Sequence, residues 1–254
     1  VIGVLLPFVP LLVWSVSRTW AYPALLPQET SLRAVRLVTD PGSAVVGGLA
    51  TSLAVATTVA VISGAIGLCA GRALGLHSFR GKRAVQFLLL APVIVPPFAV
   101  TLGIQILFIR YGLADSVPGV VLAHLVPATP YVTLVLAATY ANYDTAYEDQ
   151  ARVLGAAPWQ VLWRVTLPAV RPGLAVAMLF AFLISWSEYI LTLLVGGGAV
   201  QTLPLVLFAA VRTADTPVVA AVSLVIVLPP LLLVGLTSRF LTASAGGVAG
   251  LGRL

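Results

Sequence analysis

Few ionisable side chains interrupt the long apolar runs of this sequence, and Glu188 is the only carboxylate inside one. A charged group within a bilayer is costly, so such a residue needs a partner or a water-filled path. Ser185, Glu188 and Thr192 recur at helical spacing, with Tyr189 beside them. The pattern predicts a polar stripe on one helix that could attract a polar solute or gate its passage.

Two further apolar runs carry a similar stripe. His124 and Tyr131 lie seven residues apart in one run, and Thr101 and Gln105 lie four apart in another. We therefore expect three helices to line a solvated translocation path. For His124 and Gln105 a simple interhelical hydrogen bond is an equal alternative.

The sequence lacks the residue patterns of a catalytic site. Gly75 and Gly81-Lys82 are one residue too far apart for a nucleotide-binding loop, and Arg83 stands where a hydroxyl should bind magnesium. His, Cys and carboxylate residues show no metal-ligand spacing, and no serine sits in a nucleophile elbow. We expect no catalytic residue, no metal and no cofactor on this chain.

Composition predicts an all-α integral membrane protein. The chain is 60% hydrophobic and 9% charged, with a mean hydropathy of +1.07, whereas about a quarter of the residues in a soluble domain are charged. The net charge of +6 comes from basic residues scattered between apolar runs, without the basic stripe that nucleic acids require. The single Cys69 is expected to be a small buried hydrophobe.

Six stretches approach the ~20 apolar residues that a membrane span needs. They are residues 1–16, 45–70, 84–109, 117–140, 174–195 and 218–237. Prolines within the third, fourth and sixth stretches predict kinked helices. We expect one transmembrane domain over residues 1–254, with the short apolar piece 203–211 re-entrant or on the outer surface.

The distribution of basic residues predicts the orientation. One side holds the 71–83 loop, the 141–173 loop and the C-terminal tail, with nine Lys and Arg residues, and the other side holds five. Because basic residues accumulate in cytoplasmic loops, we expect the 141–173 loop and both termini in the cytoplasm.

The 141–173 loop is structured but unlike a membrane helix. Asp144 or Thr145 could begin a first helix, and Thr145 has the capping-box spacing to Glu148. Gly155 is expected to end this helix in a left-handed conformation, and Pro158 suits the start of a second one.

The second helix of the loop is expected to stop at Pro168. Its apolar face would be formed by Trp159, Leu162 and Trp163, extended at its far end by Thr166. Two exposed tryptophans on a helix-corner-helix predict a docking surface for a partner protein. The alternative is an ordinary amphipathic loop at the membrane surface.

This stretch resembles the cytoplasmic loop of permease subunits of type I ABC importers, whose pattern is Glu-Ala-Ala, three residues, Gly, nine residues, Ile, one residue, Leu-Pro. The matching positions are Asp149, Gln150, Ala151, Gly155, Val165, Leu167 and Pro168. Asp for Glu keeps the charge and Val for Ile keeps the branching, whereas Gln150 departs from the pattern.

Other segments are similar to the spermidine/putrescine branch of these permeases. They are residues 87–98, 109–115, His124 with Pro130-Tyr131, residues 182–192 and residues 202–204. The resemblance covers roughly residues 45–237 and favours a polyamine substrate. Ferric-ion, thiamine, sulfate and sugar permeases share most of these pieces and remain alternatives.

The resemblance implies a set of partners in a bacterial inner membrane. They are a second, similar permease subunit, two ATPase subunits that bind ATP and magnesium, and an external solute-binding protein. It also implies that Asp149 pairs with a basic group on the ATPase, while Trp159, Leu162 and Trp163 fill a groove. ATPase closure would then rock the kinked helices, as alternating access requires.

Two other classes of protein remain as alternatives. A proton-coupled secondary transporter would use Glu188 and His124 as its relay. A membrane enzyme is disfavoured because the sequence offers no catalytic cluster.

Overall fold

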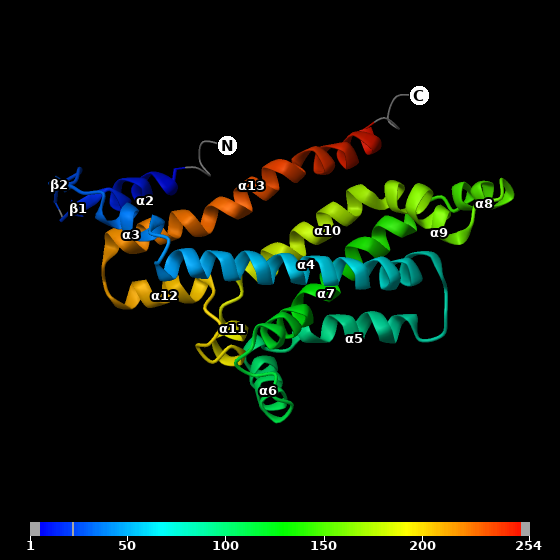
Figure 1. The fold of residues 1–254 in the computed structure, drawn as a ribbon. Coiled ribbons are helices and arrows are strands. Elements are labelled where there is room, and N and C mark those ends of the chain that lie inside the picture. The colour runs from blue at the N-terminus through cyan, green and yellow to red at the C-terminus, as the bar shows by residue number, and fades with distance from the viewer. Residues whose placement is uncertain (1–5, 22, 250–254) are drawn as a thin grey trace. The chain divides into compact units, whose positions relative to one another are not determined.

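The computed structural model describes residues 6–21 and 23–249, which are mostly helical (Figure 1). The chain divides into two compact units. One contains Val1–Val55, Ile104–Val120 and Trp186–Leu233, and the other contains Ala56–Gly103, Val121–Ser185 and Val234–Leu254. The chain passes between the units within long helices, so each unit is built from several separate segments.

The first unit begins with α2 (Phe8–Ser15), the two-stranded sheet of β1 (Ser17–Thr19) and β2 (Glu29–Thr30), and α3 (Arg33–Thr39). It also holds the start of α4 (Ala44–Leu76), α11 (Ile190–Val195) and α12 (Leu203–Arg212). Helix α13 (Thr216–Ala249) belongs to this unit as far as Leu233. The Ser52 hydroxyl on α4 accepts a hydrogen bond of 2.8 Å from the Leu203 N–H. This bond fixes the first turn of α12 against α4.

The second unit contains the rest of α4, α5 (Lys82–Ile94), the start of α6 (Pro97–Arg110), and most of α7 (Val117–Ala141) and α10 (Leu167–Ser187). Between α7 and α10 lie α8 (Ala146–Val153), α9 (Pro158–Val161) and the π-helical turn η1 (Leu162–Thr166). Figure 1 shows α8 and α9 beyond the first turns of α10.

Helices α4 and α7 approach each other closely along a row of glycines on α4. A Cβ added at Gly67 would lie 2.5 Å from a Val132 methyl, and one at Gly71 would lie 2.6 Å from the Leu136 Cβ. A Cβ at Gly75 would meet the Ala137 carbonyl oxygen at 2.6 Å. Any side chain at these positions would therefore force the two helices apart, as is common where membrane helices pack on small residues.

Within the described residues, four helices are long and apolar enough to cross a membrane. They are α4, α7, the continuous run Pro158–Ser187 and Thr216–Thr237 of α13. Helix α7 coincides with the fourth predicted stretch, and the helices at the second and sixth stretches are longer than predicted. For the first predicted span the structure describes only α2, because residues 1–5 lie outside the described part.

The third predicted span, residues 84–109, is not one kinked helix. It is the pair α5 and α6, which are bent by 91° and would count as a fifth span only if taken together. The break falls at Pro96-Pro97, where the missing N–H groups and the restricted residue before each proline interrupt helical hydrogen bonding. The prediction of one helix was therefore wrong at this point.

The fifth predicted span, residues 174–195, is also displaced. Helix α10 begins earlier and ends at Ser187, and α11 is a separate helix from Ile190. The Glu188 carboxylate accepts a hydrogen bond of 3.2 Å from the Leu191 N–H and so caps the first turn of α11. The short helix α12 matches the predicted apolar piece at 203–211.

The glycine row predicts an unusual effect of adding one methyl group. Gly→Ala normally favours a helix by about 1 kcal/mol, but Gly71→Ala should destabilise the protein by about 1–3 kcal/mol because the new Cβ overlaps Leu136. The measurement is thermal unfolding of the purified protein in detergent. Gly103→Ala is the matched control, since nothing lies within 4 Å of its added Cβ. Equal unfolding temperatures for the two variants would contradict the close packing of α4 on α7.

Candidate functional site

The corner between α8 and α9 is closed by local backbone hydrogen bonds. Gly155 has a left-handed φ of +86°. Its N–H donates to the Arg152 carbonyl at 2.9 Å, and the Ala156 N–H donates to the Ala151 carbonyl at 3.0 Å. These two bonds form a Schellman motif, so the predicted role of Gly155 in ending the helix is confirmed.

The starts of both short helices are also capped. The Asp144 carboxylate accepts a hydrogen bond of 2.9 Å from the Ala146 N–H, and the Gln160 side chain accepts one of 2.8 Å from the Ala157 N–H. Pro158 is the first residue of α9, as predicted. Thr145 makes no side-chain cap. The expected capping box with Glu148 was wrong, because Glu148 points into the protein.

The outer surface of the corner is apolar. Trp159 and Trp163 are 60% and 64% exposed, and Leu162 lies on the same surface. Val153 and Leu154, next to the glycine, are 88% and 87% exposed and were not predicted. Their signal in the sequence was that two apolar residues directly precede a helix-ending glycine. We call these five residues the apolar corner.

Thr166 does not belong to that surface. It is only 1% exposed, and its hydroxyl donates a hydrogen bond of 2.7 Å to Glu148. Its expected place at the end of the apolar face was therefore wrong. The buried side of the corner also holds Val161, which is 3% exposed.

The remaining motif residues lie on the corner or beside it. The exposed Asp149 carboxylate pairs with Arg152 at 2.8 Å, and Gln150 is exposed. Ala151 and Leu167 are half-buried and Pro168 is exposed. Asp149 can therefore exchange Arg152 for a basic group on a partner at small cost, because exposed ion pairs are weak.

Pro168 does not stop the helix as expected. The chain stays helical from Pro158 to Ser187 through the π-helical turn η1. A proline clashes with the carbonyl four residues earlier, here that of Arg164 within η1, and it offers no N–H. In the wider π turn the Leu167 N–H bonds to the Leu162 carbonyl five residues earlier, and the helix continues into α10.

Glu148 is the centre of the buried side of the corner, with a side chain only 2% exposed. Its Oε1 accepts hydrogen bonds from Arg72 Nη1 at 2.6 Å and from the Thr166 hydroxyl at 2.7 Å. Its Oε2 accepts from Arg72 Nη2 at 2.8 Å and from Arg152 Nη2 at 3.0 Å. The hydrogen bonds from Arg72, helped by Thr166, outweigh burial and lower the pKa of Glu148 to about 2.

Sequence analysis missed this cluster. Arg72 was interpreted only as a marker of orientation and Glu148 only as a helix cap. The two residues are far apart in the sequence, and the available signal was an arginine near the end of an apolar run. Arg72 is further held over the Tyr140 ring, 5.8 Å from its centroid.

The predicted path residues of the second unit are engaged in hydrogen bonds. His124 Nδ1 lies 2.8 Å from the Ser185 hydroxyl, and both side chains are buried. The buried Thr101 hydroxyl donates to the Pro97 carbonyl of its own helix at 2.8 Å. Tyr131 is exposed. For His124, the structure favours the interhelical hydrogen bond that was kept as the alternative.

Two predicted path residues of the first unit, Glu188 and Thr192, lie at the break after α10. The Thr192 hydroxyl donates to the Glu188 carbonyl at 3.2 Å, while the Glu188 carboxylate caps α11. Gln105 is half-buried on α6. Ser185, Glu188 and Thr192 therefore do not form one stripe along a continuous helix, because the helix ends at Ser187.

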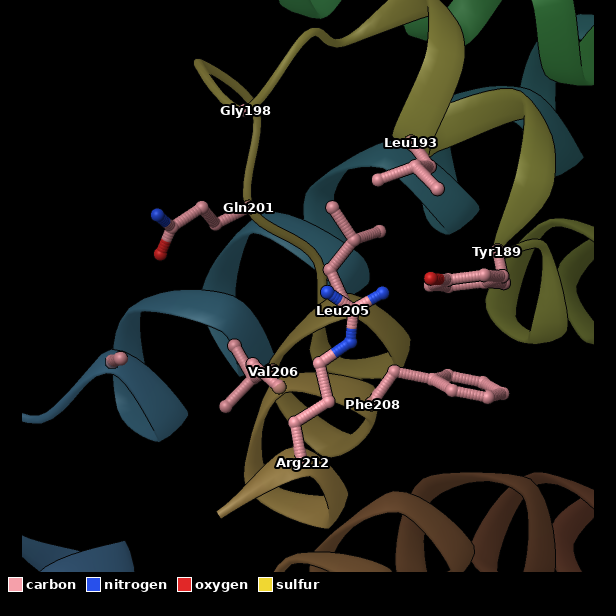
Figure 2. A pocket seen from close by; sticks show the side chains of 10 residues that line it. Tyr189, Leu193, Gly198, Gln201, Leu205, Val206, Phe208 and Arg212 are labelled. Carbon is pink, nitrogen blue, oxygen red and sulfur yellow. The ribbon is translucent and has the colours of Figure 1, made fainter.

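Tyr189 stacks on Phe208, with ring centroids 4.1 Å apart, at the side of a pocket of about 300 Å³ (Figure 2). The pocket is lined mainly by apolar residues of α11 and α12. Figure 2 shows the side chains of Tyr189 and Arg212 directed into the same space. Gln201 and Arg212 are its polar members. The pocket could hold a small solute with a polar or anionic group.

Comparison with known proteins identifies the family. Residues 64–245 match the family described as binding-protein-dependent transport system inner membrane component. The chain belongs to this family.

The relatives carry different substrate names. The chain is 28% identical over 240 residues to the putrescine transport system permease protein PotI of Escherichia coli (strain K12), covering 92% of this chain and 80% of PotI. It is 28% identical over 186 residues to the spermidine/putrescine permease protein PotC of Haemophilus influenzae, covering 73% and 72%. It is 32% identical over 220 residues to the molybdenum transport system permease protein ModB of Mycobacterium tuberculosis, covering 80% and 82%.

Solved structures show the same fold. A chain of a bacterial ABC transporter that imports the acidic polysaccharide alginate superimposes with a TM-score of 0.71 at 19% identity, covering 93% of this chain and 90% of that one. A second structure of an alginate transporter, in complex with a periplasmic protein that holds an alginate pentasaccharide, gives 0.67 at 14% identity, covering 94% and 90%.

The predicted family and fold class are therefore confirmed. The protein is an integral membrane permease component of a binding-protein-dependent ABC importer, with the helical fold of type I importer permeases. Its relatives are transport components rather than catalysts.

The pKa of Glu148 predicts a specific pH dependence of stability. The ordinary value of 4.5 falls to about 2 in the folded protein. The stabilisation from ionised Glu148 is therefore complete above pH 4.5 and is lost as the pH falls toward 2. Wild-type protein should unfold at a higher temperature than Glu148→Gln at pH 7, and the gap should narrow between pH 4.5 and 3 in thermal unfolding scans.

Asp149→Asn is the matched control for this pH experiment. Asp149 is exposed and pairs only at the surface, so this variant should unfold close to wild type at every pH. A gap between wild type and Glu148→Gln that stays constant down to pH 3 would contradict the buried ion pair.

Proposed function

We propose that this permease forms half of the solute pathway and receives the motion of an ATPase subunit through the apolar corner. The exposure of its five apolar residues carries the proposal. Large side chains such as Trp159 and Trp163 rarely cluster on a free protein surface unless a partner covers them. Both ends of α8 and the start of α9 are also capped by hydrogen bonds, so the corner can transmit motion of a bound partner without unfolding.

The mechanism follows from the arrangement of the corner. Two ATPase subunits would bind ATP and magnesium, whereas this chain would hold neither. When the ATPase dimer closes, Trp159, Leu162 and Trp163 would seat in a groove, and Asp149 would exchange Arg152 for a basic group of the ATPase. Gly155 keeps the turn, and the helix through Leu167 and Pro168 would carry the motion into α10. Rocking of the helices would then open the path alternately to each side.

The proposed assembly also contains a second, different permease subunit and an external solute-binding protein. The structural neighbour that is solved with a periplasmic protein supports the latter. The excess of basic residues on one side supports placing the corner and both termini in the cytoplasm of a bacterium. The polar residues of the spans, including Thr101, Gln105 and Tyr131, would then line part of the path.

The proposed substrate is a polyamine such as putrescine. The names of PotI and PotC support this class. The carboxylate of Glu188 and the neighbouring Tyr189 could attract a cation.

A second candidate substrate is a small anion, and the pocket beside Tyr189 favours it. Within the described residues the Arg212 side chain forms no ion pair, and it lies in an otherwise largely apolar pocket. A cation there would repel a polyamine and attract an oxyanion. The relative ModB, named for molybdenum transport, supports this class.

A more distant alternative is proton-coupled transport through Glu188 and His124. The hydrogen bonds of both side chains give each a structural role. Uptake into vesicles that contain the assembled importer separates the two mechanisms. The proposal requires uptake to depend on ATP supplied on the side of the vesicle membrane that carries the ATPase subunits. Uptake driven by a proton gradient without ATP would contradict it.

Removing the two corner tryptophans should release the ATPase. We expect Trp159→Ala with Trp163→Ala to lower the amount of ATPase subunit that co-purifies with this chain by at least about tenfold, as loss of hot-spot aromatics would. The matched control is Phe79→Ala, which removes an exposed aromatic from another loop of the same predicted side. Undiminished co-purification of the ATPase with the double variant would overturn the assigned docking surface.

The two substrate classes can be separated with one variant. In proteoliposomes with the matching solute-binding protein, Arg212→Gln should leave putrescine uptake unchanged or raise it if the substrate is a polyamine. If the substrate is an anion, the same change should lower molybdate uptake by about tenfold, in line with the loss of a charged hydrogen bond. Uptake of neither compound by the wild-type importer would exclude both classes.

A further inference from the structure

Helix α4 is not adjacent in sequence to the corner formed by α8, α9 and η1. The corner is continuous in sequence with α7, through residues 142–145, and with α10, through η1. Helix α4 precedes both by a long stretch of chain, so motion of the corner can reach α4 only through non-covalent contacts, including its packing on α7. The contact between Arg72 and Glu148 joins the two segments directly.

We infer that Arg72 is a positioning residue that makes α4 move together with the corner formed by α8, α9 and η1 during transport. This inference rests on the proposed function. Nη1 of Arg72 donates to Oε1 of Glu148 at 2.6 Å, and Nη2 donates to Oε2 at 2.8 Å. A two-point contact of this kind resists rotation as well as separation, which a single hydrogen bond does not. Both a rotation and a translation of α8 are therefore transmitted to α4.

The two ends of this link are themselves held in place. On the α4 side, Gly71 and Gly75 bring the helix backbone against α7, and the Arg72 guanidinium lies over Tyr140. On the corner side, Glu148 is also bound by Thr166 of η1 and by Arg152 of α8. One carboxylate thus connects α4, α8 and η1.

Burial separates this link from the other ion pair of the corner. Glu148 is 2% exposed, whereas the Asp149 carboxylate is 68% exposed, and both bind Arg152. An exposed pair exchanges readily with water and contributes little. Separating Glu148 from Arg72 is costly, because the buried carboxylate would keep its charge without a full set of partners or water. Asp149 can change partners during the cycle, while Glu148 keeps Arg72.

The corner does not need Arg72 to fold. Its helix ends are closed by Asp144, Gln160 and the turn at Gly155, all within the corner itself. Removing Arg72 should therefore leave the apolar corner able to bind the ATPase while disconnecting it from α4. This separation distinguishes a positioning role from a general loss of structure.

The first test measures solute transported per ATP hydrolysed in reconstituted importers. Arg72→Gln should still co-purify with the ATPase and hydrolyse ATP, but transport per ATP should fall by about tenfold or more. Arg72→Lys keeps the charge without the two-point contact, so it should recover part of the loss. Arg83→Gln, an exposed arginine in the first turn of the following helix α5, is the matched control and should behave as wild type.

The second test measures whether α4 and the corner move together. The chain has one cysteine, Cys69, which is exposed on α4 rather than buried as expected, and Tyr147 of α8 is 59% exposed outside the apolar corner. Spin labels at Cys69 and at Tyr147→Cys, with cysteine-free partner subunits, report the distance between them. The distance should be the same with and without trapped nucleotide in the otherwise wild-type chain, and it should shift or broaden with nucleotide in Arg72→Gln.

The outcomes separate the inference from the proposed function. Wild-type transport per ATP in Arg72→Gln, or a label distance that changes with nucleotide even when Arg72 is present, would overturn the inference while leaving ATPase coupling intact. Failure of the wild-type chain to bind any ATPase would instead overturn the proposed function. Loss of ATPase binding in Arg72→Gln but not in Arg83→Gln would also overturn the inference, because Arg72 would then be needed to form the corner.

Discussion

The ion pair between Arg72 and the buried Glu148 constrains the corner formed by α8, α9 and η1. Removing one partner of such a pair typically costs about 3–5 kcal/mol, because the remaining charge stays buried. Thr166 and Arg152 complete the set of donors around the carboxylate, so no oxygen of Glu148 is left without a hydrogen bond. The attachment of the corner to α4 is therefore fixed from its buried side, while its outer side stays free for a partner.

The glycine row on α4 makes this ion pair possible. Gly71 and Gly75 flank Arg72 and allow the α4 backbone to approach α7, which places the guanidinium over Tyr140 and within reach of Glu148. A larger residue at either glycine would push α4 away and lengthen the contacts to the carboxylate. Packing inside the apolar helices and electrostatics at their ends are thus parts of one arrangement.

Sequence reasoning predicted features that depend on a few neighbouring residues. Gly155 and Pro158 end and begin helices by local backbone chemistry, and both positions were predicted correctly. Pro168 and Glu188 were misjudged because their effects depend on context: a π turn lets the helix pass Pro168, and Glu188 caps a new helix. The pairing of Arg72 with Glu148 could not be predicted, since it depends on how helices distant in sequence pack.

The central claim is that the outer side of this corner is covered by an ATPase subunit. The most direct measurement places a photo-cross-linking residue at Val153 or Leu154, which the structure leaves 88% and 87% exposed, in the importer assembled in its native membrane. The account predicts a cross-link to the ATPase subunit at both positions. Cross-links only to lipid, or to the external solute-binding protein, would contradict it.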